Sequence, residues 1–213
     1  GFMTGWGYTI GLILCSVGVL AGFGGFVSMA AAAWGFPGLL HEWWVWSLLG
    51  LVVYFALSYF NVSFSTRTAI VAVILTAGTL LLLAVIVIAK GGAEGNTLKA
   101  FSPGAAGVGF DNVLAGLAFG ILSFTGFETA AVFGEETSNP RRDVPLAIFG
   151  AVLLGGVFYI IVTYATSIGY GVAEATTKWP ESAGGLGALA DGYASWIGNW
   201  VLLAGGTAAL FCG

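Results

Sequence analysis

Charged side chains are scarce in this sequence. Only 8% of the 213 residues are charged, as six basic and ten acidic side chains, whereas soluble domains carry about a quarter. A water-soluble globule is therefore excluded, because its surface could not be covered. Nucleic-acid binding is excluded as well, since it needs a clustered basic face and the net charge here is −4.

Cysteine and histidine are equally rare. The two cysteines, Cys15 and Cys212, lie in apolar runs near opposite ends of the chain, so neither a disulfide framework nor a metal site is expected. The single histidine, His41, stands beside tryptophans in an HEWW cluster and is more typical of a solvated loop residue than of a ligand. No cofactor is expected.

Hydrophobic residues make up 58% of the chain, and they are gathered into long uncharged runs. A membrane-spanning helix needs roughly 18 to 20 such residues. Runs such as LLLLAVIVIA do not alternate in polarity, which favours helices over barrel strands. The sequence predicts an all-α, polytopic transmembrane helical bundle in one domain, 1–213, with six spans at about 5–30, 43–60, 68–89, 112–136, 144–170 and 192–213.

The loops between these spans indicate an orientation. Two short polar loops, 61–67 and 137–143, hold Arg67, Arg141 and Arg142, and three longer loops lie on the opposite face. The longer loops hold as many basic residues, Lys90, Lys99 and Lys178, but the arginines of the short loops are gathered in far fewer residues. Because basic residues gather on the cytoplasmic side, this higher density favours the short loops there, in a multi-pass protein of the plasma membrane. The chain begins and ends inside apolar helix patterns, so we expect it to be an internal portion of a larger protein.

Glycine recurs inside the spans at helical spacing. Gly7, Gly11, Gly18 and Gly22 share one face of the first span. Small residues let helix backbones approach closely in lipid, so this face is suited to helix packing. The alternative is that it lines a substrate cavity.

The span at 112–136 carries an acidic residue, Glu128, well inside the bilayer, where a carboxyl is costly and usually faces a cavity or a proton path. Just before it stands Ser123-Phe124-Thr125-Gly126. A helix interrupted here would offer carbonyls that attract an ammonium and N–H groups that attract an anion. The alternative is a continuous helix with Glu128 hydrogen-bonded to a neighbour.

The stretch SFTGFETAAVFGEETSNPRRDVPLAI resembles the signature of the amino acid–polyamine–organocation superfamily of permeases. The six spans would correspond to the third to eighth helices of those transporters, which implies part of a leucine-transporter-like inverted-repeat fold. The matching positions are Gly126, Phe127, Glu128, Glu135, Glu136, Asn139, Pro140, Arg141, Arg142 and Pro145.

The resemblance also implies roles in a binding site. The break would fall between Ser123 and Gly126, and the carbonyls of Leu122 and Thr125 would face the substrate ammonium. Phe124 and Phe127 would be hydrophobic walls or plain packing residues. Glu128 matches an acid linked in relatives to proton coupling or to holding two broken helices together. The carboxylate-binding half of the family's site has no counterpart in this chain.

The loop after this span is crowded with charge. Glu135, Glu136, Arg141 and Arg142 suit an ion-pair network that fixes the cytoplasmic loop better than direct gating, because such pairs are individually weak. We expect Asn139-Pro140 to end the fourth span and Asp143 to cap the fifth, with Pro145 in its first turn.

The resemblance implies secondary active transport of amino acids by alternating access. The stretches GLILCSVG and ILSFTGF are apolar and small, which favours neutral amino acids; cationic amino acids or polyamines are the alternative. The span 68–89 has no mid-membrane lysine, so proton coupling, sodium coupling and exchange all stay open. An enzyme is disfavoured, since no span carries paired catalytic groups. A channel or a structural membrane subunit is the alternative of another class.

Overall fold

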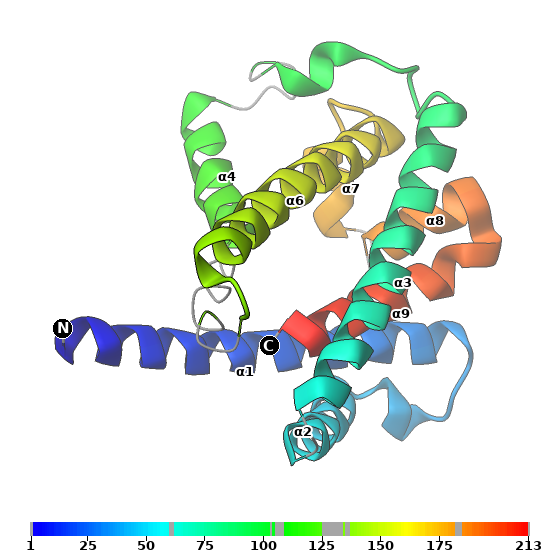
Figure 1. The fold of residues 1–213 in the computed structure, drawn as a ribbon. Helices are drawn as coiled ribbons and strands as arrows, with labels where there is room; N and C mark the ends of the chain where they lie inside the picture. Colours follow the sequence, from blue (N-terminus) through cyan, green and yellow to red (C-terminus); the bar gives the residue numbers. More distant parts are fainter. Residues whose placement is uncertain are drawn as a thin grey trace. The chain divides into compact units, whose positions relative to one another are not determined.

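The computed structural model describes residues 2–59, 62–102, 104, 109–124, 134, 137–181 and 185–212. Every regular element within these residues is helical (Figure 1). The elements in chain order are α1 (Phe2–Ala33), η1 (Gly38–His41), α2 (Trp43–Tyr59), α3 (Val62–Ala89), η2 (Leu98–Phe101), α4 (Phe110–Ser123), α6 (Pro140–Tyr170), α7 (Ala175–Glu181), α8 (Leu186–Ala194), η4 (Ser195–Ile197) and α9 (Gly198–Cys212), where η marks a short 3-10 helix.

Three of the described helices are long and apolar enough to cross a membrane. They are Phe2–Ala33, Arg67–Ala89 and Pro140–Tyr170, and a shorter apolar helix covers Trp43–Ala56. The predicted all-helical, membrane-type architecture is confirmed at this level. The count of six spans and the inverted-repeat arrangement stay predictions, because α4 and α9 each have fewer residues than a full crossing needs.

The chain divides into two compact units. The first unit comprises Gly1–Ile86 with Pro180–Gly213, and the second comprises Val87–Trp179. In the first unit α1 packs against both α2 and α9, and α8 packs against α9. Ala30, Ala190 and Val201 are almost completely buried there. The core of the first unit is therefore built mainly from small and medium apolar residues.

Two helices of the first unit approach each other closely at Gly24. A Cβ at this position would overlap the carbonyl oxygen of Trp43 and the hydroxyl of Ser47, both on α2. Ser47 also donates a hydrogen bond to the carbonyl oxygen of Leu20, at 3.0 Å. Because glycine has no side chain, the two helix backbones can come this close, as membrane helices commonly do.

The glycine face noted in the sequence does not make this contact. Within the described part of the chain, no atom lies within 4 Å of a Cβ built at Gly7, Gly11, Gly18 or Gly22. The helix packing predicted for glycine in α1 therefore falls on Gly24 instead. Spacing identifies a face, but it does not determine which face meets a neighbour.

Three helix boundaries in the described residues differ from the approximate ones expected from the sequence. The short loop expected over 61–67 is helical from Val62 onward. The fifth span begins at Pro140 rather than near 144, with Asn139 at the N-cap position in place of Asp143. The last span, expected to run unbroken from about 192, is interrupted by η4 at Ser195–Ile197 before α9 begins.

The early start of α6 has a simple physical reason. Proline is favoured in the first turn of a helix, because its missing N–H would have had no intrahelical partner. The Asn139 carbonyl then accepts hydrogen bonds from the N–H groups of Arg142 and Asp143, at 3.1 and 2.9 Å. Asp143 is left within the first turn, where its charge suits the positive end of the helix.

The second unit contains a tight junction between the ends of α3 and α6. Gly91 and Gly92 end α3 with positive φ angles of 82° and 63°, and the next residue, Ala93, donates its N–H to the Ile168 carbonyl at 2.8 Å. A Cβ on Gly92 would lie 2.6 Å from that carbonyl oxygen. Ile168 itself is only 1% exposed, so the junction forms a small core.

Candidate functional site

The candidate site begins where α4 ends. The helix stops at Ser123, and the N–H of the next residue, Phe124, donates to the Ile121 carbonyl at 3.1 Å in a final tight turn. The last four carbonyls of any helix have no partner within that helix. Together they carry a partial negative charge of about one half. This helix end can therefore accept hydrogen bonds from a cationic donor.

A tyrosine from α6 meets this helix end. The Tyr159 hydroxyl donates a hydrogen bond to the Ser123 carbonyl at 3.0 Å. Its ring packs edge-on against Phe124, with centroids 5.5 Å apart and planes at 80°, a favourable aromatic geometry. The end of α4 and the middle of α6 are thus joined by one hydrogen bond and one ring contact.

Two glycines on α6 make room for the Phe124 ring. A Cβ built at Gly156 would lie 3.7 Å from Cζ of Phe124, and one at Gly155 would lie 4.0 Å from Cε1. The ring therefore lies beside these two glycines, at ordinary van der Waals distance from where a Cβ would stand. Tyr159 follows these glycines by three and four residues, a spacing that places all three on one face of the helix.

The structure places only part of the site that the sequence predicts. Ser123 and Phe124 are brought together with Tyr159, and Leu122 lies in the last turn of α4. The other predicted members lie outside the described residues, so their roles stay predictions: Thr125, Gly126, Phe127, Glu128, Glu135 and Glu136.

Arg141 and Arg142 lie in the first turn of α6 and are exposed. Within the described part of the chain neither forms an ion pair. Their expected partners, Glu135 and Glu136, lie outside the described residues. The predicted loop network therefore stays a prediction.

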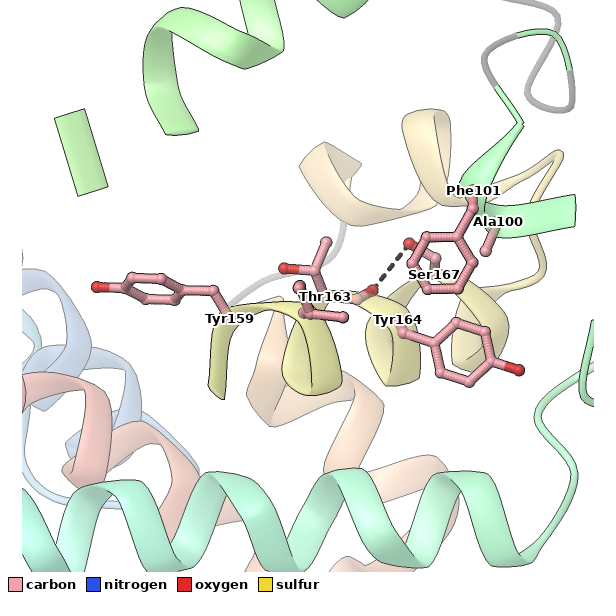
Figure 2. Close-up of a pocket in the computed structure, with 7 residues that line it drawn as sticks. Ala100, Phe101, Tyr159, Thr163, Tyr164 and Ser167 are labelled. Carbon is pink, nitrogen blue, oxygen red and sulfur yellow. Dashed lines mark hydrogen bonds between the residues drawn. The ribbon is translucent and has the colours of Figure 1, made fainter. Parts of the chain in front are cut away.

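A cleft of about 260 Å³ lies further along α6 (Figure 2). Phe101 of η2 stacks on Tyr164, with centroids 5.4 Å apart and planes at 7°. In Figure 2 the Tyr159 ring points away from this stacked pair, and its hydroxyl donates a hydrogen bond to the Ser123 carbonyl at the end of α4. The residues that line the cleft are Ala100, Phe101, Tyr159, Ile160, Thr163, Tyr164 and Ser167.

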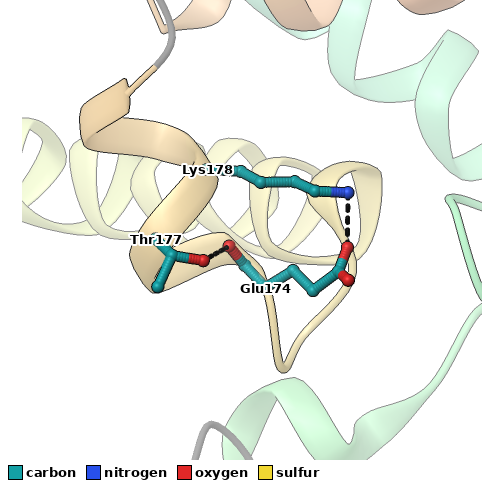
Figure 3. A network of polar contacts seen from close by, with 3 residues as sticks. All are labelled: Glu174, Thr177 and Lys178. Atoms are coloured by element: carbon teal, nitrogen blue, oxygen red, sulfur yellow. Dashed lines mark hydrogen bonds and ion pairs between the residues drawn. The ribbon is translucent and has the colours of Figure 1, made fainter.

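An ion pair is formed among the residues described. Lys178 and Glu174 form an exposed ion pair beside α7, where Thr177 also donates its hydroxyl hydrogen to the Glu174 carbonyl (Figure 3). The hydrogen bond to Glu174, followed by the carboxylate's charge, raises the pKa of Lys178 above 10.5. No cluster of three or more metal-binding side chains occurs among the residues described.

Tyr159 is the site residue that sequence reasoning missed. The signal was available, because a tyrosine inside an apolar span carries a hydroxyl that needs a hydrogen-bond partner. The span from 144 to 170 contains three tyrosines, however. Nothing in their spacing tells which of them meets the end of another helix.

Comparison with known proteins gives the family. The profile of the family described as "Amino acid permease" matches residues 1–178. The chain belongs to the amino acid permease family. Amino acid permeases are transporters and not enzymes, and this permease is an integral membrane protein with long apolar helices.

Individual relatives match the permease over shorter stretches. It is 39% identical over 71 residues to human cationic amino acid transporter 4, covering 33% of this chain and 11% of the relative. It is 42% identical over 55 residues to cationic amino acid transporter 3, mitochondrial, of Arabidopsis thaliana, covering 26% of this chain and 9% of the relative.

A bacterial relative is named for a different substrate. The permease is 44% identical over 43 residues to the low-affinity putrescine importer PlaP of Escherichia coli strain K12, covering 20% of this chain and 10% of that protein. The matches thus span about a tenth of the length of each of these relatives. No solved structure matches the chain.

Proposed function

We propose that this permease is a secondary active transporter that moves amino acids by alternating access, with the C-terminal end of α4 as one wall of its substrate site. The observation that carries the proposal is the end of α4 at Ser123, in a segment whose flanking sequence is almost entirely apolar. Helix carbonyls that end inside such a segment attract an ammonium group. A substrate amino group is the cation best matched to them.

Thr125, Gly126 and Phe127 continue this wall in the proposal. Glu128 is the coupling acid, because an intramembrane carboxyl can change protonation when a ligand or a neighbouring charge changes. Glu135, Glu136, Arg141 and Arg142 form the cytoplasmic loop network. The remaining half of the site, which holds the substrate carboxylate, belongs to the rest of the same transporter.

Neutral amino acids are the first candidate substrates. The described wall consists of the Phe124 ring, the Tyr159 ring and the bare backbone of Gly155 and Gly156, which offer apolar surface and no charge. Cationic amino acids or polyamines are the second candidate. The names of the human, plant and bacterial relatives favour them.

Reconstitution of the complete transporter in lipid vesicles tests the function. Uptake of labelled leucine, arginine and putrescine is measured with and without imposed proton or sodium gradients. We expect saturable uptake of an amino acid, and the gradient that accelerates it identifies the coupling ion. Uptake that rises linearly with concentration indicates a channel, and absence of flux for all three solutes defeats the proposal.

Glu128→Gln tests the coupling role. We expect it to abolish gradient-driven uptake and to retain exchange, because the side chain keeps its shape but loses its titratable proton. The control is Glu174→Gln, which removes an exposed acid outside the proposed site and should leave both activities unchanged. Equal behaviour of the two variants contradicts the assignment of Glu128.

A further inference from the structure

The contact between Tyr159 and the end of α4 assigns a role to a residue that the proposed site does not yet include. Resting on the proposed function, we infer that Tyr159 is a positioning residue: its hydroxyl, hydrogen-bonded to the Ser123 carbonyl, holds the terminal carbonyls of α4 in the orientation that receives a substrate's primary ammonium group. The juxtaposition that carries this is the 3.0 Å hydrogen bond together with the edge-on ring contact to Phe124.

The Ser123 carbonyl lies in the last turn of α4 and accepts a hydrogen bond from the Tyr159 hydroxyl. A peptide carbonyl oxygen has two lone pairs, and the hydrogen bond from Tyr159 fixes the direction of the Ser123 carbonyl through one of them. A helix terminus frays when its last turn has no other support. A donor fixed to a second helix therefore gives the last turn of α4 one defined position.

Tyr159 can hold the Ser123 carbonyl in one orientation only if its own side chain is held in place. Its ring packs at 80° against Phe124, and the Phe124 ring in turn lies beside Gly155 and Gly156, where a branched side chain would meet it. Tyr159, Gly155 and Gly156 share one face of α6 by their spacing. Two contacts thus hold the end of α4 against α6: the Phe124 ring beside the two glycines, and the Tyr159 hydroxyl on the Ser123 carbonyl.

The carbonyls at the end of α4 suit a ligand nitrogen that carries N–H donors. A primary ammonium carries three N–H donors, and a fully methylated nitrogen carries the same charge with none. Oriented carbonyls distinguish the two, because only the first can form hydrogen bonds. If Tyr159 sets their orientation, removal of its hydroxyl weakens binding of the primary amine and leaves the methylated ligand largely unaffected.

Tyr159→Phe in the complete transporter tests the inference. In vesicles, we expect the KM for the transported amino acid to rise about fivefold, the effect of one lost hydrogen bond, with kcat per folded transporter unchanged. The matched control is Tyr164→Phe on the same helix. That hydroxyl points away from the cleft (Figure 2), and its removal should leave the KM unchanged.

A selectivity measurement separates positioning from a merely structural role. Inhibition constants are measured for the transported amino acid, leucine or arginine, and for its α-N-trimethyl derivative. We expect the preference for the free amine to fall about fivefold in Tyr159→Phe and to persist in Tyr164→Phe. An unchanged preference in Tyr159→Phe overturns the inference, even if the amount of folded protein falls.

A second variant keeps the inference testable if Tyr159→Phe folds poorly. Gly156→Val adds a branched side chain next to the Phe124 ring. We expect it to displace the ring and the end of α4 with it, and to lower the preference for the free amine as much as Tyr159→Phe does. Gly150→Val is its control, because a Cβ at Gly150 has no described atom within 4 Å. Equal preference in these two variants argues against the inference.

Failure of the inference can be told apart from failure of the proposed function. One outcome is that the parent shows saturable amino acid uptake while Tyr159→Phe and Gly156→Val keep its preference for the free amine. That result supports the transport function and contradicts the positioning role of Tyr159. Absence of amino acid flux in the parent contradicts both the proposed function and the inference about Tyr159.

Discussion

The two units use different kinds of contact in the residues that the structure describes. In the first unit, helices meet along their faces through small residues: Gly24 lies against α2, and Gly187 and Gly206 lie against the side chains of Leu202 and Val27. In the second unit, carbonyl oxygens at helix ends accept hydrogen bonds from other segments: Ile168 accepts from the Ala93 N–H, and Ser123 accepts from the Tyr159 hydroxyl.

This difference has a physical meaning in a membrane. Faces without polar groups gain little from burial in lipid, so close packing must supply the attraction. Helix ends, by contrast, carry unpaired carbonyls and N–H groups that need partners. The region with joined helix ends is therefore the one that can offer polar groups to a solute, and the proposed site lies in it.

The largest expected effect tests face packing in the first unit. Gly24→Ala should destabilise the protein by about 3 kcal/mol relative to Gly25→Ala, because its methyl group would overlap a backbone oxygen that can move only if the helices separate. Gly25 lies in the same turn, and a Cβ there has no described atom within 4 Å. Unfolding in mixed micelles gives both values. Similar stability of the two variants would remove the distinction between the units.

An intermediate effect is expected at the junction in the second unit. Gly91 and Gly92 both have positive φ, so alanine costs about 1 to 2 kcal/mol at each. Only Gly92 also approaches the Ile168 carbonyl, at 2.6 Å. Gly92→Ala should therefore be about 2 kcal/mol less stable than Gly91→Ala.

Hydrogen exchange localises that effect. The Ala93 N–H, which donates to Ile168, should exchange faster in Gly92→Ala than in Gly91→Ala. If both variants exchange at the same rate, the junction is not the constraint that distinguishes the second unit.

The smallest effect is expected for the ion pair beside α7. Lys178→Gln should leave the unfolding midpoint unchanged within error, because exposed pairs contribute little. The pKa of Lys178 is raised above 10.5, so any stabilisation is fully present below that pH and is lost as the pH rises through the raised pKa. A difference between variant and parent that varies between about pH 6 and 9 would contradict this, since lysine stays charged there.

The sequence predicted an all-helical chain with long apolar helices, and the described residues agree at this level. The second span, expected over 43–60, is α2 at Trp43–Tyr59, because aromatic residues and a charge at Glu42 mark its start. The start of the fifth span was misplaced, since Asp143 and Pro140 are both typical of a helix N-terminus and only backbone hydrogen bonds to Asn139 decide between them.

The candidate site was predicted in part, and the reason is physical. Ser123 and Phe124 were singled out from a local pattern of hydroxyl, aromatic and glycine residues. Tyr159 was missed because its role depends on a partner 36 residues away. Thr125, Gly126, Phe127 and Glu128 lie outside the described residues, so their predicted roles are tested only by the transport experiments.

The sequence by itself determined that this chain lies in a membrane as helices and which residues resemble those of amino acid permeases, because hydrophobicity and local motifs are properties of contiguous residues. Only the tertiary structure decided that Gly24, rather than the regular glycine face, meets α2, and that Tyr159 meets the end of α4. Both are contacts between distant segments, and the direction in which each helix face points is set by packing that no local pattern records.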